Sequence, residues 1–213
     1  DSHTTAAEAV NPHAFAEDDK NLVHLGRLPH PDNLAVSWGK KLSTLLKMAF
    51  FCDAESASSN DRIIRTTKEW ITNYTQDYSN LFVVIGWSTW EREEWLIDDV
   101  YYQINASGTD IVPDSHNEKY KEYVIGVNWR HKTNQAHKDV IALHEWLEEK
   151  DIKHVFFNGN NTFSQINTKY DFGSAYIEPY NKGFSYNDHL LANGSHTVSP
   201  NSYHFGEDGH TTW

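Results

Sequence analysis

Residues that can move protons are concentrated at the two ends of the chain. The last thirteen residues, 201–213, contain His204 and His210 together with two carboxylates and two glycines. Imidazole is the side chain best suited to transfer protons near neutral pH. The chain opens with Asp1 and Ser2, a carboxylate beside a hydroxyl. We therefore predict that the fold brings the two ends together, so that Ser2 and a histidine form one catalytic centre.

The composition is that of an acidic, folded protein. The chain has 213 residues, which suits one α/β domain with a full hydrophobic core. It carries 18 basic and 30 acidic side chains, a formal charge of -12, so nucleic acid and anionic membrane surfaces are not expected as partners. The aromatic content of 14% argues against disorder. Because the sequence has no long apolar run and no visible signal peptide, we expect a soluble protein.

The sequence gives no indication of a metal or other cofactor. Its single cysteine, Cys52, excludes an internal disulfide and a paired-cysteine metal site. The thirteen histidines do not form a His-Glu-x-x-His motif. We therefore expect a reaction carried out by side chains alone.

The elements that must position the two ends alternate between strands and helices. Continuous apolar runs at 81–85 and 152–157 predict strands that are covered on both faces, and 49–52 predicts a shorter one. Apolar residues at helical spacing predict helices at 34–47, 62–75, 135–150 and 186–191. This order predicts a three-layer, flavodoxin-like α/β fold with a parallel sheet of about five strands.

We interpret residues 1–213 as a single domain. A nucleophilic serine usually sits on a turn after a buried strand, so we expect one more apolar strand upstream of residue 1. Residues 95–128 are aromatic and irregular, with Gly108 and Pro113 as breakers. They are predicted to be an insertion over the site or a surface for a partner.

The motifs at the two ends resemble those of the GDSL/SGNH hydrolases. Asp1 and Ser2 resemble the second half of the family's Gly-Asp-Ser motif, and the closing segment resembles its last block, Asp-x-x-His followed by Gly-His and a helix. The ending of residues 204–213, His-x-x-x-x-Gly-His-x-x-Trp, is most similar to a variant found in some tailed phages. The resemblance implies hydrolysis of acetyl or short acyl esters, including esters on glycans, by a serine nucleophile without a cofactor.

The resemblance also assigns roles. Ser2 is the nucleophile, with its N–H in the oxyanion hole, and His204 is the general base. The family's acid stands three residues before that histidine, where this chain has Asn201, an amide that cannot stabilise an imidazolium as a carboxylate does. In one repair, His210 is the base and Glu207 its acid. In the other, a carboxylate approaches His204 from elsewhere: Asp188, Glu207 or Asp208.

The remaining oxyanion donors also depart from the family's pattern. The glycine of its second block corresponds to Ala57 or Ser58, and the asparagine of its third block corresponds to Ser88. Asn60, at the start of a predicted helix, is a substitute donor. Losing one donor costs on the order of 10²–10³ in rate. The alternative is therefore a weak or inactive protein on the same fold, such as a phage virion component with virion proteins as its partners.

Overall fold

A pair of parallel strands forms the centre of the computed structural model. These are β1 (Phe82–Trp87) and β4 (Lys153–Asn158), which pair from Phe82 opposite Lys153 to Trp87 opposite Asn158. The short strand β5 (Tyr176–Ile177) adds to β4 in parallel, giving the order β1–β4–β5. Both long strands are the continuous apolar runs predicted from the sequence. The structure describes residues 1–12, 29–74, 77–106 and 112–213.

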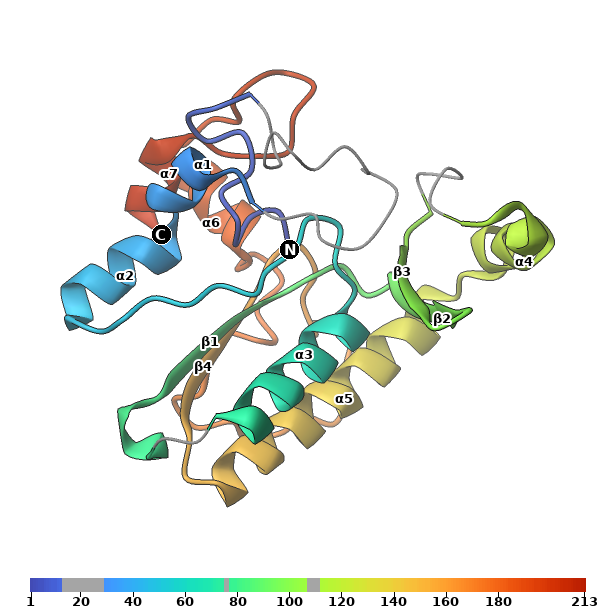
Figure 1. Ribbon diagram of the computed structural model, residues 1–213, viewed down its shortest axis with the longest axis horizontal. Helices are drawn as coiled ribbons and strands as arrows, with labels where there is room; N and C mark the ends of the chain where they lie inside the picture. Colours follow the sequence, from blue (N-terminus) through green and yellow to red (C-terminus); the bar gives the residue numbers. More distant parts are fainter. Residues whose placement is uncertain (13–28, 75–76, 107–111) are drawn as a thin grey trace.

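Helices cover both faces of this sheet because its side chains alternate between them (Figure 1). Ile85 and Phe156 pack in one apolar cluster with buried residues of α3 and α5. Val84 and Phe157 point the other way, into a second cluster with residues of α2 and α6. The bounds of these helices and of the last one are α2 (Trp38–Leu46), α3 (Asn60–Asn73), α5 (Trp129–Glu149), α6 (Tyr186–Ala192) and α7 (Glu207–Thr212).

Capping side chains decide where the helices begin. The hydroxyl of Ser59 accepts a hydrogen bond from the backbone N–H of Arg62, so α3 starts at Asn60. Ser37 caps α2 in the same way and separates it from the short helix α1 (Pro31–Ala35). The helix predicted over 34–47 is therefore two helices. No helix within the described residues is both long and apolar enough to cross a bilayer.

The sheet is smaller than the sequence predicted. The described residues form a mixed α/β structure with three parallel strands rather than about five, and a separate antiparallel pair. Residues 49–52 are apolar but form no strand. They line a groove beside β1 instead, together with residues of α2 and α3. An apolar run of this length does not by itself distinguish a strand from a groove lining.

The segment predicted as an insertion has a small apolar core of its own. Strands β2 (Glu93–Ile97) and β3 (Val100–Ile104) form a hairpin, and the short helix η2 (Asp114–His116) and α4 (Asn117–Gly126) follow it. These elements extend away from the sheet (Figure 1). Their buried residues form one cluster: Trp95, Ile97, Ile104, Val112 and Tyr120. Residues 107–111 of the predicted insertion lie outside the described residues.

Gly86 is expected to be intolerant of any side chain. A Cβ at this position would lie 2.6 Å from Cζ of Phe157, a buried ring on β4. We expect Gly86→Ala to lower the free energy of unfolding by about 1–3 kcal/mol, measured by urea denaturation. Gly126 is the matched control, because a Cβ there would meet nothing within 4 Å. Equal effects of Gly86→Ala and Gly126→Ala would contradict this packing.

Candidate functional site

The N-terminal loop and the closing segment lie close together near the carboxyl edge of the parallel sheet (Figure 1). Gly159 follows β4 and donates its N–H to the carbonyl of Trp87 at 3.0 Å. A Cβ on Gly159 would lie 3.3 Å from Oδ2 of Asp1, so the first residue sits against the ends of both strands. The ring centroids of His3 and His204 are 5.9 Å apart. The geometry therefore places Ser2, which lies between Asp1 and His3, beside the closing segment.

A turn centred on Asp1 fixes the backbone around Ser2. Oδ1 of Asp1 accepts hydrogen bonds from the backbone N–H groups of His3 at 3.1 Å and Thr4 at 3.2 Å. The carbonyl of Ser2 accepts the hydroxyl of Thr5 at 3.0 Å and the N–H of Ala7 at 3.0 Å. The side chain of Ser2 is partly exposed and its hydroxyl forms no hydrogen bond with a described residue. The contact predicted between Ser2 and the base is thus absent from this arrangement.

His204 is held by Glu8, a residue that the sequence analysis did not single out. Nδ1 of His204 lies 2.6 Å from Oε2 of Glu8, and the hydroxyl of Ser202 donates to the same oxygen at 2.7 Å. Burial alone would raise the pKa of Glu8, but these hydrogen bonds and the imidazole outweigh burial and lower it. A carboxylate can only accept, so Nδ1 of His204 carries the hydrogen. Nε2 then presents the lone pair that a general base needs.

None of the residues predicted to orient His204 occupies the position beside its Nδ1 that Glu8 fills. Asn201 is exposed, and within the described part of the chain it forms no hydrogen bond with His204. Glu207 pairs with Lys41 at 3.3 Å, and Asp188 accepts the hydroxyl of Ser185 at 2.8 Å. Asp208 is likewise exposed in the first turn of α7. The prediction that one of these residues orients the base is corrected, since the contact comes from the N-terminal loop.

His210 is a structural residue rather than a second base. Its ring is buried, and Nδ1 lies 3.2 Å from the hydroxyl of Tyr186 on α6. Burial, with a smaller contribution from the neighbouring His3, lowers the pKa of His210 to about 3. So weak a base takes a proton from a serine hydroxyl poorly. Because Glu207 is turned to Lys41, the predicted pair of His210 and Glu207 is not formed.

Two of the predicted oxyanion donors are already occupied. Oδ1 of Asn60 accepts the N–H of Ser88 at 2.9 Å, and its Nδ2 donates to the carbonyl of Ser88 at 3.2 Å. The N–H of Ser58 donates to the carbonyl of Glu55 at 3.2 Å. Ala57 has a φ of 62°, in the left-handed region that favours glycine. The backbone at Ala57 therefore adopts the conformation that a glycine would take there.

The hydroxyl of Ser88 accepts a hydrogen bond through its oxygen, and its hydrogen remains available to donate. Nη1 of Arg92 donates to Oγ of Ser88 at 2.9 Å. The O–H of Ser88 must then point away from Arg92 and can donate to another group. Ser88 itself is buried at the end of β1. Of the predicted side-chain donors, the Ser88 hydroxyl is thus the one left available.

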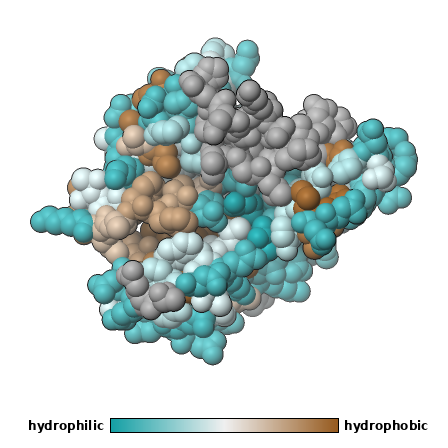
Figure 2. Space-filling view, viewed as in Figure 1, coloured by the Kyte–Doolittle hydropathy of each residue, from teal (hydrophilic) through white to brown (hydrophobic). Residues whose placement is uncertain are grey.

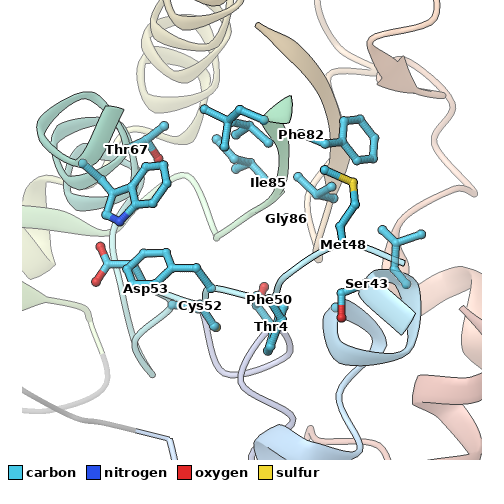
Figure 3. A pocket seen from close by; sticks show the side chains of 18 of the residues that line it. Thr4, Ser43, Met48, Phe50, Cys52, Asp53, Thr67, Phe82, Ile85 and Gly86 are labelled. Carbon is cyan, nitrogen blue, oxygen red and sulfur yellow. The ribbon is translucent and has the colours of Figure 1, made fainter. Parts of the chain in front are cut away.

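An apolar groove of about 690 Å³ begins next to this site. It is lined by residues of β1, α2 and α3, by residues 46–54, and by Asp1 and Thr4. Figure 3 shows Thr4 close to Phe50. On the surface it is a hollow of apolar residues surrounded by hydrophilic ones (Figure 2). No other strand among the described residues pairs with this edge of β1.

One group of side chains in the described residues is arranged as metal ligands, and it lies outside this site. It consists of His144, Glu148 and His154. His154 is the second residue of β4, whereas Asn158 at the other end of the strand adjoins the site. This group therefore lies at the opposite end of β4 from Asn158 and the candidate site.

The chain matches the model of a protein family. Residues 29–178 match the family of unknown function DUF6071. The matched stretch includes Ala57, Ser58, Asn60 and Ser88 but neither Ser2 nor His204. No curated protein and no solved structure matches the chain.

The buried histidines make stability fall on acidification. Burial lowers the pKa of His3 and of His210 to about 3, so between pH 6.5 and 3 the unfolded chain binds more protons than the folded one. In this pH window the unfolding free energy of the parent chain should fall as the pH is lowered. We expect this fall to be smaller by about 1 kcal/mol per pH unit in His210→Gln, which keeps an acceptor for Tyr186. The measurement is urea denaturation from pH 7 to pH 4.

The exposed His196 provides the control for this experiment. His196→Gln should retain the pH dependence of the parent chain, because this side chain is exposed to solvent rather than buried in the core. If His210→Gln and His196→Gln gave the same slope, the burial of His210 would not be the source of the acid sensitivity.

Proposed function

The chain belongs to the DUF6071 family of unknown function, and we propose that it is a serine hydrolase of the SGNH type that cleaves small acyl esters. The observation that carries this proposal is the pair formed by Glu8 and His204, 2.6 Å apart and next to the loop that holds Ser2. A carboxylate on Nδ1 fixes the tautomer of the imidazole and stabilises its protonated form. Both are needed for a general base that must later act as an acid.

In the proposed reaction, Oγ of Ser2 attacks the carbonyl carbon of the ester while Nε2 of His204 takes its proton. The tetrahedral intermediate collapses to an acyl-enzyme, and His204 returns the proton to the departing alcohol. Water then enters, loses a proton to His204 and releases the carboxylic acid. The hydroxyl of Ser2 forms no hydrogen bond with a described residue. In this proposal it bonds His204 once a substrate is bound, since catalytic hydrogen bonds often form only in the complex.

The oxyanion is stabilised by three donors in this proposal. They are the backbone N–H groups of Ser2 and Ala57 and the hydroxyl of Ser88. Arg92 contributes through Ser88, because its guanidinium donates to Oγ and leaves the Ser88 O–H to donate to another group. Asn60 and Ser58 are not donors in this proposal. Asn60 holds the backbone of Ser88, and the N–H of Ser58 is bonded to the carbonyl of Glu55 in the turn before α3. Preorganised donors of this kind are usually the largest contribution to catalysis.

The surroundings of His204 support an acyl group carried on a glycan. The adjacent ring of Tyr203 is 83% exposed. Exposed aromatic rings beside a reactive group are typical of binding surfaces, and a flat apolar ring with a polar hydroxyl suits a sugar face. Asn160 and Asn201, both exposed, add amide groups that can bind hydroxyls at the same edge.

The hydrolase proposal is tested by active-site labelling. A fluorophosphonate probe should modify Ser2, the adduct should be mapped there by mass spectrometry, and Ser2→Ala should abolish it. Ser199→Ala, at an exposed serine of the closing segment, should label normally. With p-nitrophenyl acetate as substrate, we expect His204→Ala to lower kcat by about 10²–10⁴. Absence of both labelling and turnover would favour the alternative, an inactive structural or binding protein such as a phage virion component.

A further inference from the structure

Two histidines face each other in the interior at the amino end of β4. Nδ1 of His144, on α5, lies 2.8 Å from Nε2 of His154. Nδ1 of His154 lies 2.8 Å from the carbonyl oxygen of Ile152. Because a carbonyl can only accept, Nδ1 of His154 carries the hydrogen and its Nε2 presents a lone pair toward His144. Both rings are buried.

A carboxylate completes the cluster from the same helix. Glu148 lies four residues after His144, so the two share one face of α5. The ligand atoms of His144, Glu148 and His154 all lie within 4.8 Å of one another. Glu148 is exposed, and its carboxylate is free to turn toward the two rings without disturbing the core.

We propose that His144, Glu148 and His154 form a binding site for Zn²⁺. Two imidazole nitrogens and one carboxylate oxygen are ligands that Zn²⁺ prefers, and a tetrahedral ion would have water in its fourth position. The carbonyl of Ile152 acts behind the ligands, because its hydrogen bond fixes the tautomer and orientation of His154. On binding, the proton on Nδ1 of His144 moves to Nε2 of the same ring, so both rings remain neutral.

The electrostatic surroundings also favour a cation at this position. The carboxylates of Glu148 and Glu145 place negative charge around His144. The chain as a whole carries a formal charge of -12. The bound ion would join α5 to β4 at the end of the strand opposite Asn158. It would therefore stabilise the packing of helix and sheet without contacting Ser2 or His204.

The proposal is tested by titrating the chain of residues 1–213 with ZnCl₂ in a calorimeter and with Co²⁺ in a spectrophotometer. We expect one strong site, visible absorption from tetrahedral Co²⁺, and a higher Tm in the presence of Zn²⁺. Losing a residue that only supports a metal ligand costs about 10–100-fold in affinity. Removing the ligand itself in Glu148→Gln should therefore weaken Zn²⁺ binding by about tenfold or more. Glu149→Gln is the matched control, since Glu149 is exposed on the next position of the helix but is not in the cluster.

A buried position needs a check on folding. His154→Gln should abolish the Co²⁺ spectrum while its far-ultraviolet circular dichroism matches that of the parent chain. If it unfolds, the comparison of Glu148→Gln with Glu149→Gln decides the matter, because both residues are exposed. Equal affinity in these two variants, or absence of Zn²⁺ binding by the parent chain, would overturn the proposal. Zn²⁺ held by other histidines, such as His3 and His204, would give that equal affinity.

Discussion

The close approach of three chain segments at Gly159 is the constraint on which the candidate site depends. The N–H of Gly159 bonds the end of β1 at Trp87, and its carbonyl accepts the N–H of Asn187 on α6. A Cβ there would lie 2.6 Å from the carbonyl oxygen of Trp87 and 3.3 Å from the carboxylate of Asp1. A residue with any side chain would separate these groups. The N-terminal loop, both strands and α6 can therefore converge because this position has no side chain.

The parts of the fold that follow from local patterns were predictable. The two long strands are continuous apolar runs, and α3, α5 and α6 have apolar residues at helical spacing. The extent of the sheet was not predictable, because it depends on backbone pairing between distant segments. Residues 49–52 have the apolar character of a strand, yet they pair with no strand in the described part of the chain and line the groove beside β1.

The site shows the same division between local and distant information. The meeting of the two ends was predicted from Ser2 and His204, whose residue types indicate nucleophilic chemistry. Glu8 was missed because 196 positions separate it from His204, and no spacing rule applies over that distance. The group of His144, Glu148 and His154 did have a local signal. The signal is a histidine and a glutamate four residues apart on a predicted helix, which places them on one face. A second histidine follows in the next predicted strand.

At the carboxyl end of β1, this chain has Ser88 where the SGNH pattern has an asparagine, and two neighbouring side chains make up for the difference. An asparagine at position 88 would supply both a long side chain and its own donor. Here the two requirements are divided: Asn60 fixes the backbone at Ser88 from α3, and Arg92 donates to the hydroxyl oxygen. Both polar atoms of the Asn60 side chain are engaged with the backbone of Ser88. In the proposed mechanism, these contacts orient the Ser88 hydroxyl before a substrate binds, and such preorganisation strengthens an oxyanion donor.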